Sequence, residues 1–210
     1  SVYNACGVQP PAALYEPIGT HQGCPVDYVA PRALISPTLN GQASSFFGWA
    51  GAGVYEPHGG SGSMFRSGRY VRAIHFGFDK EDLFVRVDPG EDLQEMEIDQ
   101  IAIQLQLKAP SLVAQETDRQ WTLSIPLTSP EDAALIELKG GEPRPGARAV
   151  FHKVLETGIP FAALGVAPGS KIELAIALLR DGVEFRRHPG SASILITVPD
   201  DSFEQRHWIV

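Results

Sequence analysis

The sequence predicts an all-β fold, a two-sheet antiparallel β-sandwich preceded by a proline-rich N-terminal arm. Apolar residues alternate with polar ones in several segments, and no amphipathic helical pattern separates these segments. An Asp-Gly pair, the commonest signal of a tight β-hairpin, joins two of them. The 210 residues include 21 Gly and 17 Pro, which mark many turns and disfavour a helix bundle.

Residues 1–32 are expected to form an arm or linker, and residues 33–210 the sandwich. The arm contains five prolines, which lack the backbone N–H that a central strand needs: Pro10, Pro11, Pro17, Pro25 and Pro31. Its tyrosines Tyr3, Tyr15 and Tyr28 indicate that the arm packs on the sandwich or on a neighbouring domain.

The clearest period-two patterns occupy residues 83–88, 101–108, 121–127 and 172–178. The last of these leads through Asp181-Gly182 into a partner strand at 183–187. Residues 194–198 form another strand, and further candidates are 68–78, 135–139 and 147–154. One short helical turn is expected at 160–164, where Gly165 ends it.

Charge and hydropathy exclude two classes of partner. The formal net charge of −8 disfavours a protein that tracks nucleic-acid phosphates. No apolar run approaches the roughly 18 residues of a membrane helix, so we expect no membrane partner. The chain begins at Ser1 without a secretion-signal pattern, so we expect a processed chain or a piece of a longer one. Cys6 and Cys24 form either one disulfide or two thiols.

Sequence motifs of catalysis are absent. There is no phosphate-binding P-loop and no H-E-x-x-H zinc motif. Glu56 and the acidic residues further on could supply carboxylates for glycosidic chemistry, but no spacing in the sequence places two of them together. We therefore expect no catalytic residue in this chain.

Acidic residues are concentrated between positions 79 and 99. Ca²⁺ binds carboxylate and carbonyl oxygens that turns present. Asp79, Asp82, Asp88 and Asp92 are therefore candidate ligands of a calcium ion, and solvated turns between strands are the alternative.

Several short motifs, taken in order, resemble those of one known family: Ile35–Gly41, Phe47–Tyr55, Ser63–Arg66, Ile74–Asp79, Leu83–Asp88, Ile159–Phe161, Glu184–Pro189 and Phe203–Val210. This order is similar to the C-terminal module of many glycoside hydrolase family 57 proteins. That module is similar to the C-terminal domain of glucodextranase and to family 9 carbohydrate-binding modules, among the DOMON-like sandwiches. The sequence departs from the family pattern at Asn40, where an Asp is usual, and at Phe65, where a His is usual.

The resemblance implies a non-catalytic, carbohydrate-associated module of a glycoside hydrolase that acts on α-glucans. Its expected partners are an α-glucan or oligosaccharide and the catalytic domain of the same polypeptide. The calcium sites of family 9 modules add to the expectation of Ca²⁺.

Trp49 and Tyr55 are the candidate sugar platforms, because Gly and Ala residues around them leave room for a flat ligand. Glu56, His58 and Phe65 flank the glycine-rich segment 59–63 and complete the candidate carbohydrate site. The alternative for Trp49 is a core tryptophan.

Two other functions share the predicted fold. In the first, the sandwich is purely structural and packs on its catalytic domain or on a second subunit. In the second, a DOMON-like sandwich holds haem between Met64 and His75. Exposed aromatic rings in a groove would favour sugar binding, and buried rings would favour the structural module.

Overall fold

The computed structural model describes residues 26–43, 47–57, 70–109, 118–138 and 143–207. Strands account for 48% of the structure and helices for 13%, and two antiparallel sheets pack face to face. The predicted all-β sandwich is therefore confirmed. In the described part of the chain, no helix has the length and apolar character needed to cross a membrane.

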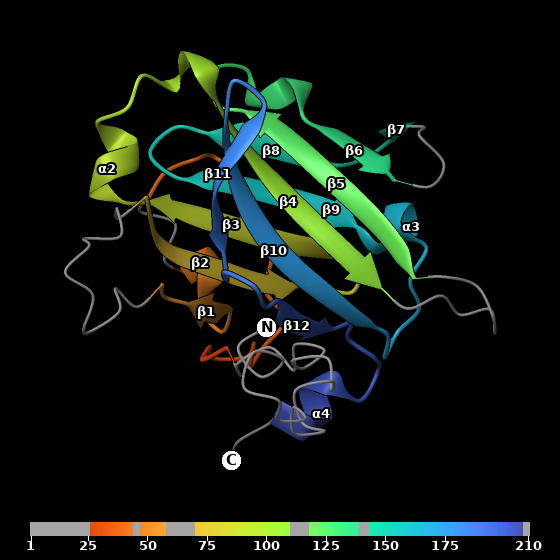
Figure 1. The fold of residues 1–210 in the computed structure, drawn as a ribbon. Coiled ribbons are helices and arrows are strands. Elements are labelled where there is room, and N and C mark those ends of the chain that lie inside the picture. Colours follow the sequence, from red (N-terminus) through yellow and green to blue (C-terminus); the bar gives the residue numbers. More distant parts are fainter. Residues whose placement is uncertain (1–25, 44–46, 58–69, 110–117, 139–142, 208–210) are drawn as a thin grey trace, which may run out of the picture.

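The smaller sheet has the strand order β1-β2-β3-β9-β8, and each neighbouring pair is antiparallel (Figure 1). Its strands are β1 (Gly53–Tyr55), β2 (Val71–Phe78), β3 (Asp82–Pro89), β9 (Leu155–Pro160) and β8 (Arg148–Phe151).

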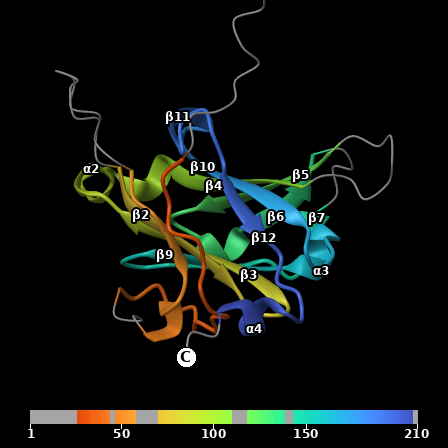
Figure 2. The same ribbon diagram turned by 90° about the horizontal axis from the view of Figure 1, so that it is seen from below.

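The larger sheet has the order β11-β10-β4-β5-β6-β7, and β12 also pairs with β10. Its strands are β4 (Ile101–Ala109), β5 (Arg119–Pro126), β6 (Ala134–Glu137), β7 (Pro143–Arg144), β10 (Lys171–Arg180), β11 (Val183–His188) and β12 (Ile194–Thr197). Figure 2 shows β4 and β10 in one layer and β2, β3 and β9 in the other. Short helices join or follow the strands: η2 (Phe47–Trp49), α2 (Glu91–Gln94), η3 (Ile98–Gln100), η4 (Pro130–Asp132), α3 (Phe161–Leu164) and α4 (Phe203–His207).

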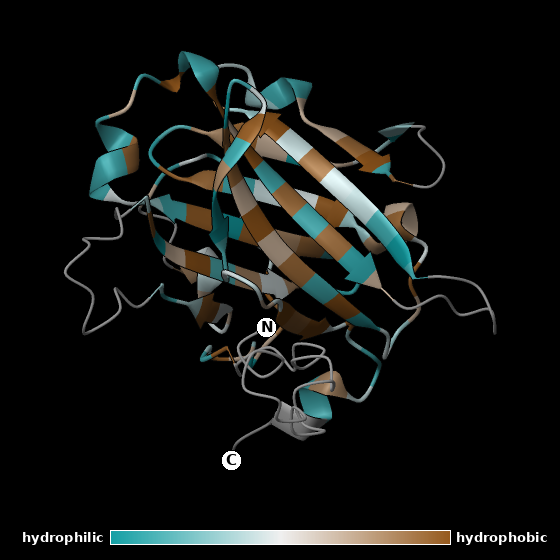
Figure 3. Ribbon diagram, in the orientation of Figure 1, coloured by the Kyte–Doolittle hydropathy of each residue, from teal (hydrophilic) through white to brown (hydrophobic). Residues whose placement is uncertain are grey.

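The main core lies between the two sheets and follows from the period-two pattern. In β4 every second residue is buried, from Ile101 to Ala109, while the residues between them are partly exposed. Figure 3 shows the result as alternating brown and paler or teal bands along β4 and β5. Trp121 is 1% exposed and belongs to this core, as its strand phase predicts.

Two local signals of the sequence are confirmed. The β10–β11 hairpin turns at Asp181 and Gly182, whose φ angles are 50° and 77°. Both values lie in the left-handed region that a type I′ turn requires. Helix α3 ends at Gly165, which has a φ of 59° and caps the last turn.

A segment before β1 crosses the outer face of the smaller sheet, and we call residues 26–43 and 47–52 the covering segment. Its Val29 forms an isolated bridge with Val54, and Ile35 N donates to the Phe78 carbonyl at 2.9 Å. Ile35 and Trp49 pack with Phe84 in a second, smaller core cluster. Residues 26–32 of the predicted arm run along the edge of the smaller sheet, where Val29 pairs with β1 and Tyr28 packs against the main core, and residues 1–25 lie outside the described residues.

Candidate functional site

The outer face of the smaller sheet carries charged side chains that are almost fully buried. Strand pairing aligns His75 of β2 with Arg86 of β3, and Arg86 with Glu156 of β9. Arg86 is 7% exposed, Asp88 4% and Glu156 0%. Buried charges are costly unless partners satisfy them, so their contacts determine what this face can do.

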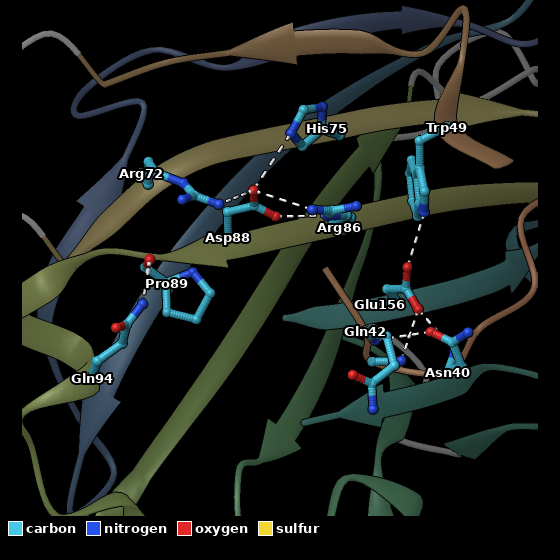
Figure 4. Close-up of polar contacts among 11 residues, drawn as sticks. Asn40, Gln42, Trp49, Arg72, His75, Arg86, Asp88, Pro89, Gln94 and Glu156 are labelled. Carbon is cyan, nitrogen blue, oxygen red and sulfur yellow. Dashed lines mark hydrogen bonds and ion pairs between the residues drawn. The ribbon is translucent and has the colours of Figure 1, made fainter. Parts of the chain in front are cut away.

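Glu156 anchors the covering segment to the sheet (Figure 4). Its Oε1 accepts a hydrogen bond of 2.9 Å from the indole Nε1 of Trp49. Its Oε2 accepts from the backbone N–H groups of Asn40 and Gly41, at 2.8 and 2.9 Å. Both carboxyl oxygens are therefore occupied by donors from the covering segment.

Asp88 is the centre of a second group of contacts. Its Oδ1 accepts from Arg86 Nε at 2.6 Å, and its Oδ2 accepts from Arg72 Nη2 at 2.8 Å. His75 Nε2 lies 3.8 Å from Oδ2. Burial by itself would raise the pKa of Asp88, but the contacts with His75, Arg86 and Arg72 outweigh it and hold the pKa well below its usual value. Asp88 is thus an ionised structural partner of arginines.

The candidate sugar-binding residues do not form one exposed platform. Trp49 is 6% exposed, and its polar edge is bonded to Glu156. Tyr55 is half-buried and packs against the main core, on the opposite side of the sheet, and burial raises the pKa of its hydroxyl. Glu56 is exposed, while His58 and Phe65 lie outside the described residues. The burial of Trp49 agrees with the alternative of a core tryptophan.

The four candidate calcium ligands are divided between the two ends of β3. Asp79 Oδ1 accepts from the backbone N–H groups of Glu81 and Asp82 in the β2–β3 turn. Asp82 pairs with Arg148 at 2.5 Å. Asp88 lies at the other end of β3, about 20 Å away at the usual rise of a strand. Asp92 follows in α2.

Among the described residues, no group of three His, Cys, Asp or Glu side chains could hold a metal ion. Of the two predicted haem ligands, His75 lies against Asp88, and Met64 is outside the described residues. Cys6 and Cys24 are also outside them.

A different surface offers room for a ligand. A groove of about 540 Å³ lies over the outer face of the larger sheet, on the side of the molecule opposite the covering segment. Strands β4, β5 and β10 form its floor, which faces the viewer in Figure 1. Most of its polar lining consists of amide and hydroxyl side chains: Gln104, Gln106, Gln120, Thr122, Ser124 and Ser193.

Hydrogen bonds connect the polar side chains of the groove floor. Gln106 Nε2 donates to Gln104 Oε1 at 2.9 Å, and Arg187 Nη1 of β11 donates to Gln106 Oε1. Lys108 Nζ lies 2.9 Å from Asp118 and 3.9 Å from Glu173. The hydrogen bond to Asp118 and the charge of Glu173 raise the pKa of Lys108.

The polar groove residues of β4 and β5 share one phase of the period-two pattern. The buried phase of β4 and β5 identifies the core, and the polar phase is typical of any solvent-facing sheet. A run of amide and hydroxyl groups in two adjacent strands is the signal that marks this face as different from a charged, solvated one. The position of Arg187 on the same face depends on the register of the β10–β11 hairpin, which the sequence pattern does not show.

Fold and groove together define an antiparallel β-sandwich with one covered outer face and one open, polar outer face. Comparison with known proteins adds no relative: no family model, curated protein or solved structure matches this chain.

Proposed function

We propose that this chain is a non-catalytic carbohydrate-binding module and that the groove over the larger sheet is its glycan site. The observation that carries the proposal is the floor of amide and hydroxyl groups in an open groove of about 540 Å³. An amide offers both donors and acceptors, and a hydroxyl offers both as well. Such a surface matches a ligand that carries many hydroxyl groups.

The apolar part of the groove supports the same ligand class. Ile136 and Leu138 line the side formed by β6 and the residue after it, and Leu138 is 59% exposed. The C–H faces of a sugar ring pack against apolar side chains of this kind, while its hydroxyl groups reach the polar floor. An α-glucan is the ligand expected from the resemblance to modules of glycoside hydrolases.

The carboxyl groups of the groove support a non-catalytic role. Glycoside hydrolysis needs two carboxyl groups about 5 to 10 Å apart on either side of the scissile bond. Glu173 is the only carboxylate among the described residues that line the groove, and Lys108 lies between it and Asp118, so this carboxyl pair is bridged by a cation rather than placed on either side of an open site. Catalysis would then belong to another domain of the same polypeptide, the partner that the resemblance implies.

Isothermal titration calorimetry with maltooligosaccharides, dextran fragments and xylooligosaccharides tests the proposal. We expect the wild-type chain to bind maltooligosaccharides. The double variant Gln104→Ala/Gln106→Ala should lose at least about tenfold in affinity, equivalent to ~1.4 kcal/mol. Gln100→Ala is the matched control, because Gln100 is exposed and lies outside the groove lining. A wild type that binds no glycan, or a double variant that binds equally well, would contradict the proposal.

The second candidate is a purely structural module, and a specific observation favours it. Both tryptophans of the described chain are buried, at 6% and 1% exposure for Trp49 and Trp121. Neither of these tryptophans therefore offers an exposed ring platform for a sugar. If no glycan binds while the module forms a stable complex with its catalytic domain, the structural function is the correct one.

A further inference from the structure

Arg187 occupies an unusual position for a cation. It lies opposite Ala177 in the β10–β11 pair, on the face of β11 that borders the groove. Its neighbour Arg186 takes the other face and lies over the ring of Tyr70 at 5.6 Å. A register shift between Leu178 and Leu179 sets this alternation for the end of the hairpin. Of two consecutive arginines, one therefore belongs to the groove.

Small residues let Arg187 reach the groove floor. Strand β10 presents Ala175 and Ala177 between β11 and β4, and these residues pair with Gln106 and Gln104. With no larger side chain in between, the guanidinium of Arg187 extends across β10 and donates to Gln106 Oε1. The carboxylate of Glu184, 3.7 Å from Arg187 Nη1, partly balances its charge.

This contact determines the orientation of two amide groups. A guanidinium only donates hydrogen bonds, so Gln106 must turn its oxygen toward Arg187. Its NH₂ group then faces Gln104, which must present its own oxygen, as the 2.9 Å bond between them shows. The NH₂ group of Gln104 is consequently directed away from Gln106. Gln104 pairs with Ser124 of β5, whose hydroxyl lies on the same face.

We infer that Arg187 is the positioning residue of the groove: it orients the glutamine pair so that the groove offers N–H donors to acceptor oxygens of a bound glycan. The inference rests on the proposed function. Arg187 acts through Gln106 and Gln104, and the ligand contacts the amide groups. Because the row has an arginine at one end and free donors at the other, the two directions of a saccharide chain are not equivalent in the groove.

Two variants test the polarity of this row, with maltoheptaose as the probe in isothermal titration calorimetry. Arg187→Leu removes the orienting donor, and we expect affinity to fall about tenfold. Arg187→Lys keeps a donor and should retain affinity within about threefold of wild type. Gln104→Glu replaces the free NH₂ by a carboxylate oxygen of the same shape, so affinity should fall more than about tenfold. Arg186→Leu is the matched control and should bind like wild type, because Arg186 lies on the other face.

A double variant separates positioning from simple contact. If Arg187 acts by orienting the amides, Gln104→Glu should cost less affinity in the Arg187→Leu background than in the wild type. A ligand-free readout is the ¹⁵N spectrum of the side-chain amides: Arg187→Leu should shift the NH₂ signals of Gln104 and Gln106, whereas Arg186→Leu should not.

The outcomes distinguish a failure of the role assigned to Arg187 from a failure of the proposed glycan binding. Wild-type binding that is unchanged in Arg187→Leu, or unshifted amide signals, overturns the inference and leaves the proposed function intact. Preference for an acidic oligogalacturonide that is lost in Arg187→Leu also overturns it, because Arg187 would then contact the ligand's charge. A wild type that binds no glycan refutes the proposed function, and the inference fails with it.

Discussion

Replacing Trp49 tests whether this indole is a sugar platform or a structural anchor. Trp49 is 6% exposed and packs in the small cluster with Ile35 and Phe84, between the covering segment and the smaller sheet. Truncating a buried tryptophan to alanine costs about 3 to 5 kcal/mol. At about 2 to 4 °C per kcal/mol for a chain of this size, Trp49→Ala should lower the melting temperature by about 6 to 20 °C.

A second substitution isolates the hydrogen bond to Glu156. Trp49→Phe keeps most of the ring but removes the Nε1–H donor, 2.9 Å from Oε1. Hydrogen bonds to charged groups contribute about 1.5 to 3 kcal/mol, so the melting temperature should fall by about 3 to 12 °C. Glu156→Gln should be destabilising as well, because an amide offers one oxygen where donors from the covering segment occupy both. The two changes should show a coupling energy of about 0.5 to 3 kcal/mol, as expected for residues in contact.

Urea unfolding followed by far-UV circular dichroism measures these differences without depending on tryptophan fluorescence. Phe47→Ala is the control from the same helical turn: Phe47 is 90% exposed, and its loss should change stability by less than about 0.5 kcal/mol. The reasoning is refuted if Trp49→Ala melts like the wild type and loses retention on glucan affinity gels. That result would make Trp49 an exposed platform.

Two further predictions concern pH and calcium. Burial, with a smaller effect of nearby Arg186, lowers the pKa of His188 from 6.5 to about 4. Between these pH values the unfolded chain binds the proton and the folded chain does not, so the free energy of unfolding falls as the pH drops from 6.5 to 4. We expect a fall of about 1 to 2 kcal/mol, which includes a discount for the partial exposure of His188. Urea titrations across this range should show a shallower decline in the free energy of unfolding for His188→Gln than for the wild type, and an equal decline would contradict the prediction. For calcium, the four predicted ligands are divided between the two ends of β3, so we expect them to give no stabilisation by millimolar Ca²⁺. A melting temperature that rises with Ca²⁺ and returns with EDTA would contradict this expectation.

The sequence predicted the sandwich well because its signals are local. The alternation in residues 101–108 and 172–178 became β4 and β10, and Asp181-Gly182 formed the expected hairpin. Candidate segments 68–78 and 147–154 contain β2 and β8, and 135–139 overlaps β6, which begins one residue earlier. The period-two pattern does not identify β9, because both faces of that strand are buried, one by the core and the other by the covering segment.

A core position was one of the two interpretations of Trp49, but its hydrogen-bond partner could not be predicted because Glu156 is 107 residues away in the chain. The Gly- and Ala-rich residues around it suggested space for a ligand, but small residues also permit close packing. A side chain at Gly51 would begin 2.7 Å from Ala33 Cβ, and one at Gly53 would begin 2.6 Å from the ring of Phe76. The sequence shows that these positions are small and does not show what approaches them.

The groove was missed for a related reason. Polar residues of β4 and β5 mark an outer face, and both sheets have one. The pairing of β4 with both β5 and β10 brings Ser124 and Ala177 to either side of Gln104. Nothing in the local pattern of residues 183–188 indicates that Arg187 reaches this floor while Arg186 turns to Tyr70.

The anchoring of the covering segment on Glu156 also affects how the chain assembles during synthesis. Trp49 leaves the ribosome 107 residues before the carboxyl group that receives it. At about 5 to 20 residues per second, this interval lasts about 5 to 20 s. Throughout that time the indole N–H of Trp49 lacks the carboxyl group that accepts its hydrogen bond in the finished protein. The covering segment is therefore not anchored on Glu156 until β9 has been made, which makes the nascent chain a candidate client for chaperones during this interval.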